Sequence, residues 1–138
     1  MALLRVTAAQ PLDMTELSQR QWRRMFGLQA RQVIESEALT FRTEGGELVA
    51  ICGLWLDERQ GWWEAWFAAA PACGRHMLPL VRMLRRCFAD GATIAPGTEV
   101  RAYVDGVAGP RMLRWLGFAD VGLTETPAGV LPTWRRVL

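Results

Sequence analysis

The spacing of apolar and polar residues predicts that the chain begins with a strand and a helix. Residues 3–8, LLRVTA, form a short and mostly apolar run that is typical of a strand. Residues 11–27 predict a helix, with Asp13 as its N-cap and Glu16 three residues later. Gly27 stands where this helix would end. The start of the chain is therefore expected to form a strand followed by a helix.

Residues 28–70 predict a second helix and then three strands. The helix covers residues 28–38, and the strands cover residues 39–43, 47–56 and 62–70. The sequences EGG and DERQG separate the strands, and glycine in such turns supplies a positive φ. An antiparallel meander is therefore expected. Its middle strand is apolar at nearly every position, which predicts that both of its faces are covered.

A strongly amphipathic helix is predicted over residues 78–90, LPLVRMLRRCFAD. Its apolar positions recur at i, i+3 and i+4, and they are Met77, Leu80, Val81, Leu84, Cys87 and Phe88. Arg82, Arg85 and Arg86 line the opposite side. Pro79 is expected in the first turn, because a proline deeper in a helix would break its hydrogen bonding.

The last part of the chain predicts a strand, a short helix and another strand. These elements lie in residues 99–123, EVRAYVDGVAGPRMLRWLGFADVGL. Gly117 is expected to end the helix in a left-handed conformation, and Phe118 to begin the final strand. The buried helix face would be formed by Met112, Leu113 and Leu116, with Trp115 partly covering it. Residues 124–138 are expected to be a C-terminal strand or tail, so the predicted order is β-α-α-β-β-β-α-β-α-β.

Composition narrows the class of protein without naming a chemistry. The chain has 138 residues, is 51% hydrophobic and carries a net charge of +2, which fits one globular domain over residues 1–138. All of its basic residues other than the single histidine are arginine, but so small a net charge argues against nucleic-acid binding. The sequence contains no apolar run that could span a membrane and no signal peptide, so a cytoplasmic location is expected.

The three cysteines argue against both a disulfide framework and a metal site. Cys52, Cys73 and Cys87 lie far apart, and no CxxC pair occurs. Cys52 and Cys87 fall in apolar runs, so both are expected to be small core residues. We therefore predict no bound metal.

The element order, together with Val104–Phe118, resembles the GCN5-related N-acetyltransferase (GNAT) superfamily. The most specific part is a strand end, a short helix and the sequence LGF, and the resemblance covers nearly the whole chain. It implies an α+β GNAT fold with a mostly antiparallel twisted sheet of about six to seven strands, flanked by about four helices. It also implies that the fourth and fifth strands separate and that acetyl-CoA lies between them.

A narrower resemblance connects the chain with short GNAT-like proteins encoded among the structural genes of tailed bacteriophages, such as the T7-type internal virion protein A family. It is carried by a Trp-rich fourth strand, an Arg-His turn, a VD strand end and the sequence RWLGF. It implies a virion component that acts through contacts with phage structural proteins or with a second copy of itself. Such a protein would lie in the host cytoplasm or in the particle, without a membrane or a specific nucleic acid as partner.

The resemblance implies a pyrophosphate loop before the 78–90 helix, and the loop departs from the family pattern. If Gly74 is aligned with the first glycine, Pro71 replaces a basic or amide residue and His76 replaces a second small residue. Pro79 also removes one backbone N–H. The candidate cofactor-binding residues of this degenerate loop are Cys73, Gly74, Arg75, His76 and Met77. Arg75 and His76 can still attract an anion, which leaves weak acetyl-CoA binding open, and the alternative is a plain helix-entry turn with a solvated Arg75.

The family's proton donor has no counterpart at the aligned position. The pattern places Gly106 where an asparagine belongs and Leu113 where a tyrosine belongs. Leucine cannot donate a proton to the leaving thiolate. The single tyrosine, Tyr103, lies on the preceding strand, so this step would need water or another group.

Glu64 is the candidate catalytic base that the resemblance implies. It lies on the fourth strand among Trp62, Trp63 and Trp66, and apolar surroundings raise the pKa of a carboxyl group. The alternatives are that Glu64 is a solvated residue of a half-buried strand, or that His76, the single histidine, is the base.

The tryptophans divide between core and surface. Those expected in the core are Trp22, Trp55 and Trp115. Trp62, Glu64 and Trp66 share one face of the fourth strand and Trp63 takes the other, so one of these faces can offer an aromatic surface. Trp134 in the C-terminal segment would either pack on the sheet or contact a partner.

Three functions remain open from the sequence. The first is a phage-type GNAT-fold protein that has lost catalysis and acts in virion assembly. The second is an active N-acetyltransferase that transfers an acetyl group from acetyl-CoA to an amine of a protein, peptide or small molecule. The third is a nucleotide- or CoA-binding sensor without turnover.

Overall fold

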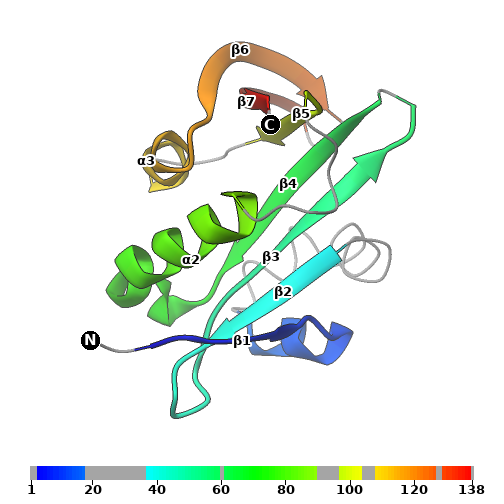
Figure 1. The fold of residues 1–138 in the computed structure, drawn as a ribbon. Helices are drawn as coiled ribbons and strands as arrows, with labels where there is room; N and C mark the ends of the chain where they lie inside the picture. The colour runs from blue at the N-terminus through cyan, green and yellow to red at the C-terminus, as the bar shows by residue number, and fades with distance from the viewer. Residues whose placement is uncertain are drawn as a thin grey trace. The chain divides into compact units, whose positions relative to one another are not determined.

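A computed structural model describes residues 3–17, 37–59, 61–89, 97–103, 108–126 and 129–137. The protein has an α+β fold with a seven-stranded mixed sheet, whose strand order is β1-β2-β3-β4-β5-β7-β6 (Figure 1). The strands are β1 (Arg5–Ala8), β2 (Glu37–Arg42), β3 (Leu48–Asp57), β4 (Trp62–Ala69), β5 (Glu99–Tyr103), β6 (Ala119–Thr126) and β7 (Gly129–Val137). The helices are the 3-10 helices η1 (Pro11–Glu16) and η2 (Pro71–His76) and the α-helices α2 (Met77–Ala89) and α3 (Ala108–Trp115). The predicted fold class is confirmed, and the C-terminal segment, expected as a strand or tail, supplies the seventh strand.

The chain forms two compact units, and the first consists of Met1–Trp55 and Trp66–Leu80. In this unit β1 pairs with β2, and β2 pairs with β3, in both cases antiparallel (Figure 1). Residues 48–52 of β3 are buried at every position, which confirms that its first half is covered on both faces. The buried core cluster consists of Met14, Leu17, Leu48, Ile51, Trp66, Ala68 and Ala70, with Trp55 packed against it.

Gly53 on β3 allows the close approach of a core tryptophan. A Cβ atom built on Gly53 would lie 2.5 Å from both Cε2 and Nε1 of Trp66. Real Cβ contacts are not that short, so the indole ring occupies the space that any side chain at residue 53 would need. The contact therefore requires glycine at this position of β3.

The predicted helix over residues 11–27 is wrong over its first turns. The described part is the 3-10 helix η1, and its N-cap is Gln10 rather than Asp13. The chain leaves the helix at Leu17, whose backbone is extended (ψ 155°). Residues 18–36, which include Gly27 and Trp22 and most of the predicted second helix, lie outside the described residues. The end of that second helix is also wrong, because residues 37 and 38 belong to β2 and pair with β3.

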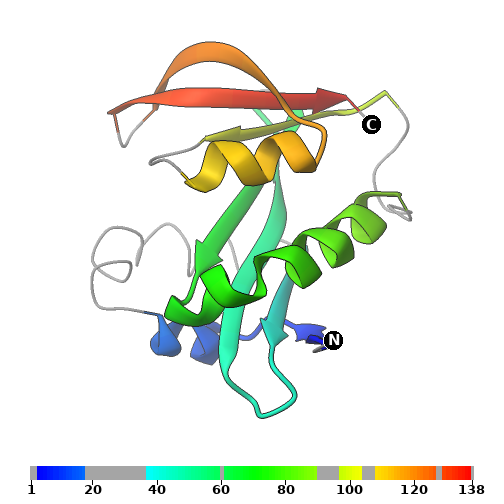
Figure 2. The same cartoon turned by 90° about the vertical axis from the view of Figure 1, so that its left-hand side faces the viewer.

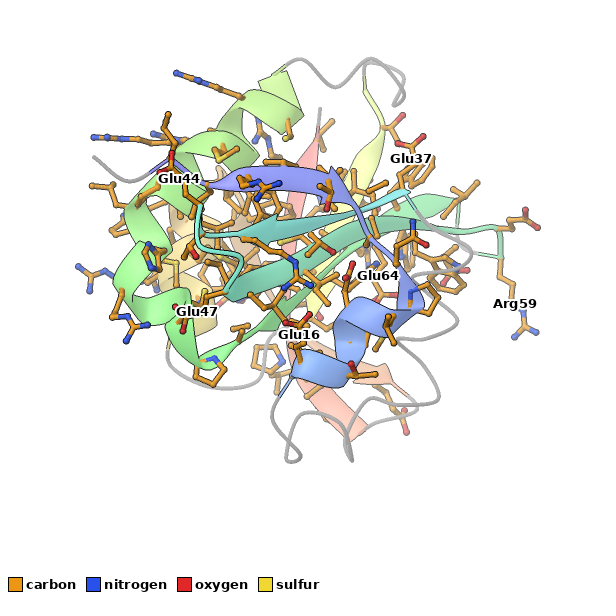
Figure 3. The ribbon with its side chains drawn as sticks, turned by 90° about the horizontal axis from the view of Figure 1, so that it is seen from below. Glu16, Glu37, Glu44, Glu47, Arg59 and Glu64 are labelled. Carbon is orange, nitrogen blue, oxygen red and sulfur yellow. The ribbon has the colours of Figure 1, made fainter. Side chains whose placement is uncertain are left out.

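Asp13 connects η1 to β2, and it caps η1 from the N3 position of a capping box rather than as the N-cap residue. Its carboxylate accepts hydrogen bonds from the Gln10 backbone N–H (2.9 Å), the Thr40 hydroxyl (2.8 Å) and Arg42 Nη2 (3.0 Å). Burial by itself raises the pKa of Asp13, but these three hydrogen bonds and the charge of Arg42 outweigh it and lower the pKa. Arg42 also pairs with the Glu16 carboxylate, labelled in Figure 3. A long-range ion-pair network therefore holds the first helical turn.

The second unit consists of Leu56–Ala65 and Val81–Leu138. In it β7 pairs antiparallel with β5 and β6, and α3 lies along the side of these strands (Figure 2). Gly117 has φ +87°, which confirms the predicted left-handed end of the helix, and Phe118 is buried. In β6 the pairing register shifts between Asp120 and Gly122, where Gly122 has φ +106°. This irregularity is a β-bulge in the outermost strand.

Helix α2 begins at Met77, so Pro79 lies in its first turn as predicted. Its buried face includes Leu80, Val81 and Leu84. The prediction that Cys87 belongs to the core is wrong, because this residue lies on the exposed part of the helix. Cys52 is buried as expected, and no disulfide joins the three cysteines, all of which lie within the described residues.

Trp115 and Trp134, near the end of the chain, differ in how deeply they are buried. Trp115, expected in the core, is 38% exposed because it falls in the last turn of α3. Trp134 is buried and packs on the sheet, and the Arg114 guanidinium lies over its ring at 5.3 Å. The packing alternative therefore holds for Trp134.

None of the helices described here is both long enough and apolar enough to cross a membrane. The described residues also contain no group of three metal-ligating side chains.

Candidate active site

The parallel pairing of β4 with β5 positions the first part of the candidate site. The ladder joins Trp63 with Val100 and Glu64 with Arg101. Pairing in the described residues ends there, although β4 continues to Ala69 and β5 to Tyr103. Glu64 thus lies at the last described position of the ladder between β4 and β5.

Glu64 lies half-buried beside this ladder (Figure 3). Burial raises the pKa of its carboxyl group, and the negative charge of Asp57 raises it further. The raised pKa has the direction that apolar surroundings predict. Glu64 is therefore not fully solvated, and its carboxylate is more basic than that of an exposed glutamate.

Arg101, the partner of Glu64 in the ladder, contacts Trp62 and Glu99 with its guanidinium group. Its guanidinium lies 3.8 Å from the centre of the Trp62 ring, and its Nε lies 3.3 Å from a Glu99 carboxylate oxygen. The other oxygen of Glu99 is 3.0 Å from the Nε of Arg135. Glu99 thus partly neutralises Arg101, which leaves the pKa of Glu64 dominated by burial and by Asp57.

Tyr103 and Asp57 belong to the surroundings of Glu64 although the sequence did not assign them to the site. Burial raises the pKa of Tyr103, and the negative charge of Glu64 raises it further, while Arg101 and a hydrogen bond with Trp62 lower it. The phenol therefore stays protonated at neutral pH. Residues 101 and 103 lie on the same face of β5 because side chains alternate along a strand. This pattern points to Tyr103 as a neighbour of Glu64 only once β5 is known to pair with β4.

The residues of the predicted pyrophosphate loop form the 3-10 helix η2, which leads directly into α2. Cys73 is buried, and burial raises the pKa of its thiol, so it is no reactive thiolate at neutral pH. Arg75 is exposed and its Nη2 lies 3.2 Å from a carboxylate oxygen of Glu47, which Figure 3 labels. His76 and Met77 follow with half-buried side chains.

Three observations test whether this loop fits the diphosphate of acetyl-CoA. A Cβ atom built on Gly74 would have no neighbour within 4 Å, so an anion has open access to the backbone there. The Arg75–Glu47 pair is solvent-exposed, and such pairs are weak enough to exchange for a phosphate. The N–H groups contribute less, because Pro71 has none and that of Cys73 is bonded to the Ala70 carbonyl. The loop therefore fits a phosphate through side-chain charge more than through backbone N–H groups.

The position aligned with the family's proton-donating tyrosine is structural. Leu113 is 5% exposed and forms part of the buried face of α3. Its carbonyl accepts hydrogen bonds from Leu116 (3.1 Å) and Phe118 (2.9 Å), which end the helix. Gly106 lies outside the described residues. No proton donor is thus available at residue 113.

Solved structures that resemble this chain include N-acetyltransferases. A GNAT-superfamily phosphinothricin acetyltransferase from Sinorhizobium meliloti, determined in complex with acetyl-CoA, has a TM-score of 0.66 and 15% identity, over 99% of this chain and 88% of that one. A GCN5-related N-acetyltransferase from Kribbella flavida has a TM-score of 0.62 and 13% identity, over 98% of both chains. An aminoglycoside 6'-acetyltransferase type Ii has a TM-score of 0.63 and 16% identity, over 96% of both chains.

The sequence comparisons add no relative to these structures. No protein-family model matches the chain, and no curated protein matches it. Identities this low carry the fold and not the activity, because one fold supports many functions. The chain has the GNAT fold.

Proposed function

We propose that the protein is an acetyl-CoA-dependent N-acetyltransferase in which Glu64 removes the proton from the acceptor amine. The observation that carries this proposal is the half-buried Glu64 carboxylate with a raised pKa, at the position of β4 where its described pairing with β5 ends. A base works best when its pKa approaches the working pH. Burial and the charge of Asp57 move Glu64 in that direction.

The charges around Glu64 also favour a cationic acceptor. Glu64 and Asp57 are two carboxylates that affect each other electrostatically, whereas the Trp62 ring already carries the Arg101 guanidinium. An ammonium group is attracted by the two carboxylates, and loss of its proton then produces the nucleophile. Primary amines are therefore the acceptor class that this surface fits.

The candidate residues for holding acetyl-CoA are Cys73, Gly74, Arg75, His76 and Met77. Gly74 supplies open access to the backbone, and Arg75 supplies a guanidinium that can exchange Glu47 for a phosphate. When bound, acetyl-CoA supplies the activated acetyl group. Tyr103, protonated at neutral pH and close enough to Glu64 for the two groups to affect each other, is the candidate proton donor in place of residue 113.

The test measures cofactor binding and acetyl transfer separately. Calorimetric titration with acetyl-CoA is expected to give micromolar binding, and Arg75→Gln is expected to weaken it about tenfold. Mass spectrometry of a panel of primary amines then detects the added acetyl group. Glu64→Gln is expected to abolish transfer and keep binding, whereas the exposed-turn variant Glu58→Gln is the matched control and is expected to change neither.

Two results would refute the proposal. Unchanged transfer by Glu64→Gln would remove this residue from the reaction. Absence of acetyl-CoA binding by the wild type would refute the proposal that the protein is an acetyl-CoA-dependent enzyme.

A second candidate is a scaffold without catalysis that acts through protein contacts, as in the phage virion proteins named above. It is supported by the buried Leu113 at the donor position and by the two prolines, Pro71 and Pro79, at the start of the η2–α2 segment. It predicts no acetyl-CoA binding at millimolar concentration. The calorimetric titration therefore distinguishes the two candidates directly.

A further inference from the structure

A groove in the second unit contains none of the residues assigned to acetyl transfer. It lies where α3 ends, β6 begins and β7 ends, and its volume is about 680 Å³. This volume lies in the range of pockets that hold small molecules. Its apolar wall includes Trp115, Leu116, Val121 and Val137.

Three arginines line the same groove. Arg85 comes from α2, and Arg135 and Arg136 are neighbours near the end of β7. Of the described residues that line the groove, none is acidic. The groove therefore presents a positive potential beside an apolar wall, a combination that selects anions.

The guanidinium of Arg136 is held in a fixed place. Its Nη1 donates a hydrogen bond of 2.6 Å to the Leu116 carbonyl at the end of α3. The same group packs on Gly117, where a built Cβ atom would lie 3.6 Å from it. Because the helix end positions this guanidinium in advance, a ligand would not have to order it.

The other two guanidinium groups are more accessible. The Nε of Arg135 contacts Glu99 at 3.0 Å, and its side chain remains 47% exposed. Arg85 is exposed on α2 and has no ion pair within the described part of the chain. A guanidinium presents a fork of N–H donors that matches a carboxylate or phosphate.

The apolar wall of the groove brings several solvent-exposed apolar side chains together. Trp115 is 38% exposed, Val121 is 51% exposed and Val137 is 52% exposed, and the three line one groove. Covering such side chains with an apolar ligand body removes their surface from water, which stabilises the complex. The arginines alone would attract any anion, and the wall adds a preference for an anion with an apolar body.

We propose that this groove binds a small organic anion, with a carboxylate or phosphate on Arg85 and Arg135 and an apolar or aromatic body on Trp115 and Val121. The proposal does not depend on acetyl transfer. It gives the protein a second ligand site, for a molecule that is neither the acetyl donor nor the amine.

Fluorescence titration with 8-anilinonaphthalene-1-sulfonate, an aromatic anion, tests the site in the full chain. We expect saturable binding by the wild type, and about tenfold or weaker affinity in the Arg85→Gln/Arg135→Gln double variant. Arg59→Gln is the matched control, because Arg59 points away from the protein at the β3–β4 turn (Figure 3). Unchanged affinity in the double variant, or an equal loss in the control, would overturn the proposal.

Competition identifies the anionic group, and a second variant separates binding from folding. Displacement of the probe by decanoate assigns a carboxylate, and displacement by phenyl phosphate assigns a phosphate. Displacement by neither would overturn the site. Val121→Asp places a repelling charge on the exposed wall of an outermost strand, so it is expected to keep the thermal midpoint and lose the probe. Retained binding in this variant would also contradict the proposal.

Discussion

Replacement of Gly53 by alanine tests whether the close approach of Trp66 organises the core of the first unit. The new methyl group would lie 2.5 Å from two atoms of the indole, whereas ordinary contacts begin near 3.4 Å. The ring would therefore have to move by about 1 Å. Trp66 is only 7% exposed and belongs to the same core cluster as Ile51, so this movement disturbs packed neighbours.

The expected cost of Gly53→Ala is about 1–3 kcal/mol of unfolding free energy, the usual range for overpacking. For a chain of 138 residues this corresponds to a fall in the thermal midpoint of roughly 3–10 °C. Thermal and urea unfolding followed by circular dichroism measure both quantities. Gly74→Ala is the matched control, because the space around Gly74 is open and its φ is not positive, so it is expected to be neutral or slightly stabilising.

A double-mutant cycle makes the reasoning refutable. Trp66→Leu removes the indole atoms that clash with the new methyl group, so Gly53→Ala is expected to cost much less in that background than in the wild type. If alanine at residue 53 costs the same in both backgrounds, the contact with Trp66 is not the cause of the loss.

Three further predictions concern single residues. The folded protein binds the Glu64 proton more tightly than the unfolded chain does, because the pKa is raised. The stability of the wild type relative to Glu64→Gln should therefore fall as pH rises above the ordinary pKa of 4.5, and it should level off above the raised pKa. Urea unfolding from pH 4 to 8 measures this difference. Asp13→Asn should cost about 1–2 kcal/mol at pH 7, and this difference should disappear as pH falls below the ordinary 3.8 through the lowered folded pKa; a constant difference would contradict the network at Arg42. Gly117→Ala should cost about 1–2 kcal/mol from its φ of +87°, and Gly117→Asn should cost less when the two are compared by thermal unfolding.

The elements that could be predicted are those whose cause lies in neighbouring residues. The buried half of β3 follows from an uninterrupted apolar run, and the place of Pro79 follows from the geometry of its ring. Gly117 ends α3 because a left-handed residue is needed there. In each of these cases the local chain contains the whole argument.

The elements that could not be predicted depend on residues distant in sequence. From its neighbours in sequence Asp13 resembles an N-cap, but its carboxylate accepts hydrogen bonds from Thr40 and Arg42 of β2. Pro132 made the C-terminal segment look like a tail, yet this segment forms β7 and pairs with both β5 and β6.

The candidate site was predictable in its composition and not in its electrostatics. Glu64 could be named from its place among tryptophans, and burial does raise its pKa. The contribution of Asp57 and the closeness of Tyr103 arise from strand pairing, which the sequence does not encode locally. These surroundings are what would make Glu64 a base.

The bulge in β6 affects how readily the protein aggregates at high concentration. This strand ends the sheet, and Leu123 on it is 72% exposed, a combination that invites another polypeptide to add itself in register. The left-handed Gly122 and the hydrogen bond from its N–H to Asp120 (2.9 Å) bend the ribbon and interrupt the regular row of donors and acceptors. The exposed edge of the sheet is thereby made a poor template for fibril growth, and we expect a variant with a regular β6 to aggregate more readily.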